Sequence, residues 1–220
     1  MDSEIVVRGT GQVWVLPDRA VLRVIVDGEG STRDEAYAEA APLAGRVDEV
    51  VAAHGPGVER TTTAALAVQP KTRWRRGETI RTGWRASRTS VLEVTDLVVL
   101  GDLFAELAAA GGAVEGPSWQ VDPENPAHAE VRRLAAADAR QRAEAYAVAL
   151  GLRVGGVAWV AEPGLRPGTP GDHVGPAARF AVTASAEVAD ADVIDVTPDE
   201  IVLDAAVEVG FTYLARATAS

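Results

Sequence analysis

The sequence predicts an α+β fold, in which antiparallel strands form hairpins and about three helices pack on the sheet. Two observations carry this prediction. Runs rich in β-branched and aromatic residues are separated by Gly, Pro and Asp turns, which is typical of hairpins. Three longer segments place apolar side chains at helical spacing between those hairpins. Helices inserted between hairpins, rather than strictly alternating with single strands, favour α+β over a parallel α/β sheet.

The first sixty residues predict a hairpin followed by a helix. Residues 5–15 and 20–26 are expected to be its two strands, joined by a turn at Pro17-Asp18. A helix is expected from Ser31 to about His54, because a hydroxyl followed by acidic residues suits a helix start. Pro42 lies inside that pattern and predicts a kink or break, since proline removes one helical hydrogen bond.

The remaining elements follow the same logic. Residues 58–74 and 79–94 predict a second, longer hairpin that turns at 75–78. Two more helices and three more strands are then expected, at 96–110 and 128–150, and at 114–121, 154–161 and 201–214. Eight prolines and glycines in residues 163–176 predict a mobile loop, and 216–220 a frayed tail. Residues 1–215 are expected to form a single domain.

Composition narrows the class of protein. The 220 residues have a formal charge of −11 and are 47% hydrophobic, which is ordinary globular usage. The absence of cysteine excludes disulfides, thiolate catalysis and cysteine–zinc sites. No apolar run approaches the roughly 20 residues of a membrane-spanning helix. No secretory signal is visible at the start, so the expected location is cytoplasmic.

Candidate catalytic motifs are weak. The three histidines, His54, His128 and His173, lie at element boundaries or in a loop, so no metal site is expected. Gly9 and Gly11 would need a third glycine at position 14, which is tryptophan, to begin a dinucleotide fingerprint. They are interpreted as a bulge or close crossing in a strand. No nucleophile–base pair or cofactor loop is present, so we expect a non-enzymatic protein without cofactor or small-molecule substrate.

Several motifs occur together in one order along almost the whole chain. They are Val7-Arg8-Gly9-Thr10-Gly11 running to Pro17-Asp18-Arg19-Ala20, Ser31 to Ala36, Gly83-Trp84-Arg85-Ala86, Ala135 to Glu144 continuing to Gly151, and Thr197-Pro198-Asp199-Glu200-Ile201. As an ordered set they resemble the SIMPL family, which includes bacterial periplasmic oxidative-stress-defence proteins and a Brucella antigen. The resemblance implies an α+β domain that can assemble into rings or channel-like oligomers, and assigns no catalytic residue.

The most specific of these motifs has a structural explanation. Asp138 and Arg142 are four residues apart on the last helix and are expected to form a surface ion pair. Ala135, Ala139 and Ala143 form one stripe, which would let the helix approach the sheet closely.

A basic segment at residues 71–88 is the strongest functional lead. Seven basic residues and one acid give it a charge of +6, leaving −17 on the other 202 residues. The candidate binding or interface residues are those of this segment that carry positive charge or an indole ring: Lys71, Arg73, Trp74, Arg75, Arg76, Arg81, Trp84, Arg85 and Arg88.

Three interpretations of this segment stay open. The arginines of a solvated hairpin could protect exposed strand edges from aggregation. The segment of one copy could dock on an acidic face of another, because Arg and Trp are enriched at interface hot spots. Arginines interleaved with tryptophans could bind an anionic ligand such as single-stranded nucleic acid. The first functional choice is a self-assembling scaffold or stress-associated protein, since a chain at −11 repels polyanions at a distance.

Overall fold

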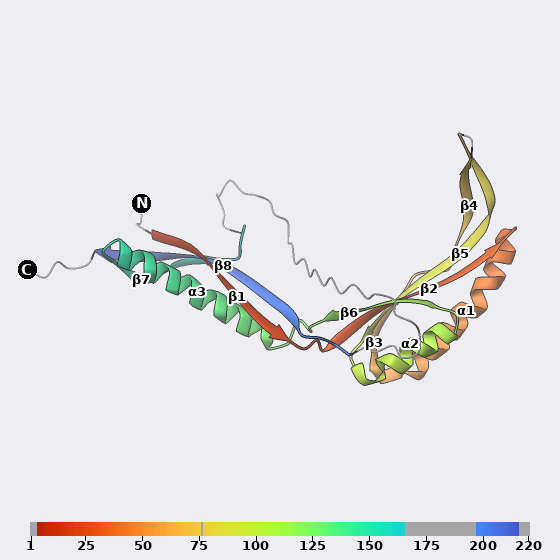
Figure 1. The fold of residues 1–220 in the computed structure, drawn as a ribbon, viewed down its shortest axis with the longest axis horizontal. Helices are drawn as coiled ribbons and strands as arrows, with labels where there is room; N and C mark the ends of the chain where they lie inside the picture. The colour runs from red at the N-terminus through yellow and green to blue at the C-terminus, as the bar shows by residue number, and fades with distance from the viewer. Residues whose placement is uncertain (1–3, 76, 166–196, 216–220) are drawn as a thin grey trace, which may run out of the picture. The chain divides into compact units, whose positions relative to one another are not determined.

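The computed structural model describes residues 4–75, 77–165 and 197–215 (Figure 1). The structure confirms the α+β class, with three α-helices and antiparallel sheets in those ranges. The expected loop lies outside the described residues from 166 onward, as does the tail 216–220. None of the described helices is both long and apolar enough to cross a membrane.

The chain divides into two compact units. The first consists of Met1–Leu16, Pro123–Ala181 and Glu200–Ser220, and the second of Pro17–Asp122 and Val182–Asp199, within which only the residues given above are described.

Unit 1 is a three-stranded antiparallel sheet covered by one helix. Its strands are β1 (Glu4–Val15), β8 (Ile201–Ala215) and β7 (Leu152–Ala161), in the order β1-β8-β7. Helix α3 (Ala127–Ala149) packs along β1 and β8. Val7, Val209 and Phe211 form the small apolar core with the alanines of α3.

A glycine pair sets the close approach of α3 to β1. A Cβ at Gly9 would lie 2.5 Å from the backbone nitrogen of Ala139, and one at Gly11 would lie 2.7 Å from that of Ala135. The β1–β8 register runs without interruption, so the glycines mark a close crossing rather than a bulge. Between them, the amide of Thr10 donates to Asp138 at 2.8 Å.

Asp138 therefore has two partners on the strand and helix. Arg142 also donates to it, at 2.8 Å, which confirms the expected ion pair. The Thr10 amide and then the Arg142 guanidinium hold the pKa of Asp138 below its ordinary value.

Unit 2 is a larger antiparallel sheet with two helices on it. The strand order is β3-β5-β2-β6, and β4 also pairs with β5. The strands are β2 (Arg19–Gly30), β3 (Val58–Thr63), β4 (Ala67–Arg75), β5 (Glu78–Val94) and β6 (Ala113–Gln120). The helices are α1 (Arg33–Ala53) and α2 (Leu100–Ala109), with short 3-10 turns η1 (Gly55–Gly57) and η2 (Leu97–Val99). Leucines and valines of β2, β5 and α2 form its core.

The same glycine–alanine contact recurs in unit 2. A Cβ at Gly28 would lie 2.6 Å from the nitrogen of Ala40, and one at Gly30 would lie 2.6 Å from that of Ala36. Between the glycines, the amide of Glu29 donates to Glu39 at 2.6 Å. In each unit, a strand with a Gly-x-Gly sequence thus contacts two helical alanines that are four residues apart. An acidic residue directly precedes the second alanine. The acid satisfies a backbone donor that the close contact would otherwise leave unpaired.

Arg19, at the start of β2, is a largely buried cation surrounded by four carboxylates. Its side chain is 12% exposed and pairs with Glu93 and Asp122, while Asp18 and Glu59 lie at 3.7 and 3.8 Å. These acids come from four separate segments of unit 2. Arg19 therefore ties the beginning of β2 to β3, to β5 and to the end of the unit.

Two strand predictions are wrong. Residues 5–15 and 20–26 do not form a hairpin: β1 pairs with β8, whereas β2 pairs with β5 and β6. Residues 58–74 are also not one continuous strand, because 64–66 separate β3 from β4. The first error came from treating strands that are adjacent in sequence as partners. In the second, the predicted pairing with 79–94 is confirmed for both β3 and β4, and only the continuity of the run is wrong.

Helix α1 has no break at Pro42 and extends without interruption to Ala53. The proline is exposed, while Ala40, Ala44 and Val47 on the opposite side are buried against the sheet. Burial of that face offsets the one hydrogen bond that proline removes. The helix begins close to the expected place, because Thr32 and Glu35 form a capping box.

Candidate interaction arm

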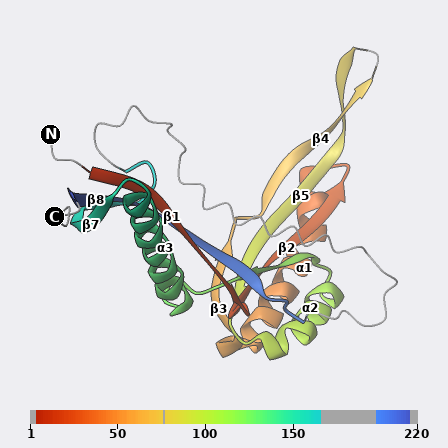
Figure 2. The same cartoon turned by 60° about the vertical axis from the view of Figure 1, so that its left-hand side comes forward.

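Residues 71–83 form a two-stranded arm that extends beyond the rest of the sheet of unit 2 (Figures 1 and 2). Strand β2 ends at Gly30, opposite Trp84, whereas β5 and β4 continue together past that point. The two strands turn at Gly77, whose φ of 86° lies in the region that favours glycine. The arm contains five basic residues and one acid, Glu78.

The structure separates the candidate residues into three groups. Lys71, Arg85 and Arg88 are neutralised by acids of the same unit. Arg81 and Trp84 contact each other. Arg73 and Trp74 are exposed on the arm. The side chains of Arg75 and Arg76 lie outside what the structure describes.

The neutralised cations tie the base of the arm to its unit. Lys71 donates to both carboxylate oxygens of Glu29 at 2.7 and 2.6 Å. Arg85 donates from Nε to Asp27 at 2.9 Å. Arg88 bridges β5 and α1, with Asp48 and the Ala44 carbonyl each at 2.8 Å. Its side chain is only 11% exposed, so its charge is not available to a partner.

The pair between Arg85 and Asp27 leads to a pH-dependent expectation. The hydrogen bond from Arg85 holds the pKa of Asp27 below its ordinary value of 3.8, with a further contribution from Ser87. A carboxylate with a lowered folded-state pKa stabilises the fold above its unfolded pKa and loses that contribution as the pH falls. We expect Asp27→Asn to unfold at lower urea concentration than the native chain near about pH 7, and the gap to shrink near about pH 3. An unchanged gap at the two pH values would contradict this role.

Trp84 is covered by two guanidinium groups. The Arg33 guanidinium, from the first turn of α1, lies 4.9 Å from its ring centroid, and that of Arg81 lies 5.4 Å away. Cation–π contacts of this kind contribute about 0.5–1 kcal/mol at exposed sites. The ring also packs against Ala36, Ala40 and Ala86. Trp84 is therefore a structural residue at the base of the arm.

Arg73, Trp74 and Ile80 are the exposed features of the arm. Trp74 is 69% exposed and Ile80 is 45% exposed. Within the described residues, neither Arg73 nor Arg81 has a carboxylate in salt-bridge distance. Register places the two guanidiniums on opposite faces, because Arg73 is opposite Ile80 while Thr72 is opposite Arg81.

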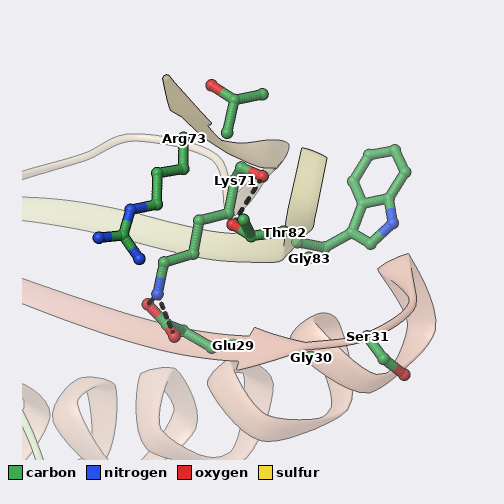
Figure 3. Close-up of a pocket in the computed structure, with 9 residues that line it drawn as sticks. Glu29, Gly30, Ser31, Lys71, Arg73, Thr82 and Gly83 are labelled. Atoms are coloured by element: carbon green, nitrogen blue, oxygen red, sulfur yellow. Dashed lines mark hydrogen bonds and ion pairs between the residues drawn. The ribbon is translucent and has the colours of Figure 1, made fainter. Parts of the chain in front are cut away.

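Two hollows lie along the arm. The larger, about 640 Å³, is at its base and is lined by residues at the end of β2 and by both arm strands (Figure 3). Figure 3 shows Lys71 reaching Glu29 across this hollow, with Arg73 alongside and Thr82 donating to the Lys71 carbonyl at 3.2 Å. The smaller, about 410 Å³, is lined by Arg73, Trp74, Ile80 and Thr82. The two share Arg73 and Thr82.

Sequence reasoning missed the residues that complete the arm. Asp27, Glu29, Asp48 and Arg33 come from β2 and α1, and no local signal links them to residues 71–88. Ile80 and Thr82 lie within the segment but carry neither a charge nor an indole ring, so the criteria that selected the other residues do not select them. Alternation along β5 would have placed Ile80 on an exposed arm face.

The chemistry of the arm lies in its backbone edges, guanidinium groups and apolar side chains, which can bind a partner. No group of three His, Asp or Glu residues could hold a metal ion in the ranges that the structure covers.

Comparison with known proteins adds the family. A search of curated proteins finds no match. Among solved structures, a hydantoinase/carbamoylase family amidase from Burkholderia ambifaria is 21% identical, with a TM-score of 0.27, over 48% of this chain and 29% of that one. A protein described as an amidohydrolase/peptidase from Burkholderia cenocepacia is 23% identical, also with a TM-score of 0.27, over 61% and 35%.

The chain thus spans about a third of the length of those two proteins, and the TM-scores are too low to bear on fold or activity. The family comparison covers far more of the chain. The model of SIMPL, described as "Protein of unknown function (DUF541)", matches residues 5–211. That range runs from the first glycine pair on β1, through both helix–strand contacts and the arm, to the middle of β8. The chain therefore belongs to the SIMPL family.

Proposed function

We propose that this SIMPL protein is a non-enzymatic scaffold that assembles with copies of itself through the arm. In this proposal, the arm of one copy docks on an acidic surface of the next. A head-to-tail contact of this kind joins two different surfaces, so it generates a ring or a filament rather than a closed pair. A stress-associated role is added only through the family resemblance.

The exposed Trp74 and Ile80 carry the proposal, together with the guanidiniums of Arg73 and Arg81, which have no carboxylate partner among the described residues. An exposed tryptophan between arginines on a projecting strand pair has the composition of an interface hot spot. The arm has a formal charge of +4, whereas the whole chain has −11, so the rest of a second copy is strongly acidic. Opposite charges of this kind steer association and select its orientation.

The ion pairs within the chain reduce the number of residues that are available for a contact with another copy. Lys71, Arg85 and Arg88 already have acidic partners, so their charges add little attraction for another copy. The contact therefore depends on Arg73, Trp74, Ile80 and Arg81 rather than on the whole 71–88 segment.

Reversing the charges of Arg73 and Arg81 tests the proposal. We expect Arg73→Glu/Arg81→Glu to reduce the native mass, measured by light scattering, from an oligomer to a monomer. A matched control, Arg133→Glu/Arg140→Glu on α3, makes the same change in net charge at exposed positions and should keep the native mass. The proposal fails if the unmodified chain is monomeric, or if the arm variant keeps the oligomeric mass.

Single-stranded nucleic acid is the second candidate, and the geometry favours it less. Sequence-tolerant binding of single strands uses several aromatic platforms, each stacking on one base. The Trp84 ring is already flanked by Arg33 and Arg81, which leaves Trp74 as the exposed tryptophan of the arm.

A further inference from the structure

One edge of β5 is left without a strand along the arm. On one side β5 pairs first with β3 and then with β4 over almost its whole length. On the other side it pairs with β2, but only from Trp84 onward. Residues 78–83 therefore present an unpaired edge in the part of the chain that the structure describes. Six residues of strand span about 20 Å.

Strand β2 stops pairing with β5 at Gly30, and the start of α1 explains why. Thr32 and Glu35 form a capping box, and Ser31 also donates to Glu35, so only two residues separate the end of β2 from the start of the helix. Gly83 in β5 allows a close approach to the end of β2, because a Cβ there would lie 2.9 Å from the Gly30 carbonyl. β2 therefore stops at Gly30, and the edge of β5 beyond it stays open.

The larger hollow lies at this step. It is bounded by Glu29, Gly30 and Ser31 at the end of β2 and by residues 71–73 and 82–84 of the arm. The smaller hollow continues past Arg73 toward Trp74 and Ile80. The larger hollow therefore adjoins the base of the open edge, and the smaller one lies farther along the two arm strands. Strand edges with unpaired donors and acceptors are templates for adding another strand.

The charges beside the edge define what can be added. Arg73 lies on one face of the ribbon and Arg81 on the other, and neither has a carboxylate partner among the described residues. The acidic residue in the larger hollow, Glu29, is neutralised by its ion pair with Lys71. Side chains of an added strand alternate between the two faces, so acidic residues on either face would meet a guanidinium.

We propose that the open edge of β5 at residues 78–83 binds an extended, acidic polypeptide segment, which pairs as an added strand in line with β2. A second arm does not fit, because like charges opposite each other destabilise a strand pair. Apolar residues of the segment pack beside Ile80 on one face and beside Trp74 on the other. The segment is held by backbone hydrogen bonds and oriented by Arg73 and Arg81.

This inference rests on the proposed function in taking residues 71–83 as the interaction arm, and it names the chemistry that the arm accepts. The probe is a fluorescent twelve-residue peptide with the repeat Glu-Glu-Val-Val, which places acidic and apolar residues on both faces of an extended strand, added to the full chain. We expect saturable binding by fluorescence anisotropy and slower amide hydrogen exchange at residues 78–83. In Arg73→Glu/Arg81→Glu the affinity should fall at least tenfold, and in Arg133→Glu/Arg140→Glu it should be unchanged.

Two further probes separate strand pairing from attraction of charge alone. The same peptide N-methylated at every residue keeps its charge but has no backbone donor, so it should not bind. Equal binding of the two peptides would overturn the proposal, as would tighter binding of a twelve-residue oligo-deoxythymidine. No binding of the unmodified peptide would also overturn it. That result leaves the proposed function standing if the arm variant still loses its oligomeric mass, whereas peptide binding by a monomeric chain would reject self-assembly alone.

Discussion

Arg19→Met is expected to lower the free energy of unfolding by about 3 kcal/mol, measured by urea denaturation. The Arg19 side chain is only 12% exposed, and it pairs with Glu93 and Asp122, with Asp18 and Glu59 close by. Removing one partner of a buried ion pair costs about 3–5 kcal/mol because the remaining charges lose their compensation. Here four carboxylates would be left around an apolar side chain, and their partial exposure places the expected cost at the lower end.

Arg23→Met is the matched control on the same strand. Arg23 is exposed and lies 3.8 Å from an exposed partner, Glu115, so its replacement should change stability by less than about 0.5 kcal/mol. In the double variant Arg19→Met/Glu93→Gln, part of the loss should be recovered, because one of the uncompensated charges is gone. Equal stabilities of Arg19→Met and Arg23→Met would show that the buried cluster does not hold unit 2 together.

Gly9→Ala is expected to destabilise unit 1 by about 2–3 kcal/mol. The added Cβ would meet the backbone of α3 at Ala135 and Ala139, and a backbone cannot move aside by changing rotamer. Inserting a methyl group into such a contact forces helix and strand apart, which is the cost of overpacking. Urea denaturation followed by circular dichroism measures the effect. Gly28→Ala should act similarly in unit 2, because its Cβ would meet Ala36 and Ala40 in the same way.

Gly156→Ala provides the comparison within unit 1. Gly156 is also in a strand, β7, but a Cβ there has no atom within 4 Å. Its replacement should be neutral or slightly stabilising, by about 0.5 kcal/mol, since alanine restricts the unfolded chain. A loss of stability equal to that of Gly9→Ala would mean that the close crossing is not the reason for glycine at position 9.

Local patterns were sufficient to predict the elements and the hairpin of β4 with β5, but not the partner of β1. Helix α3 and its alanine stripe were readable from spacing alone, as was the start of α1. The partner of β1 was not, because β8 begins at Ile201 and nothing near residues 5–15 points to it. A strand's partner is decided by which faces are buried together, and this depends on segments far apart in the sequence.

The candidate site divides in the same way. A run of basic residues with two tryptophans was enough to locate the arm at residues 71–83. It could not show that Asp27, Glu29 and Asp48 neutralise three of those cations, since these acids lie on β2 and α1. The ion pairs within the chain fix three of the cations to their own unit. Arg73, Trp74, Ile80 and Arg81 remain available for a partner.

The most direct test of the central claim is the native mass of the unmodified chain beside Arg73→Glu/Arg81→Glu, measured by light scattering over a range of concentrations. We predict an oligomer for the first and a monomer for the second, with both proteins folded by circular dichroism. Identical masses at every concentration would contradict the assignment of the arm as the surface through which copies of this protein assemble.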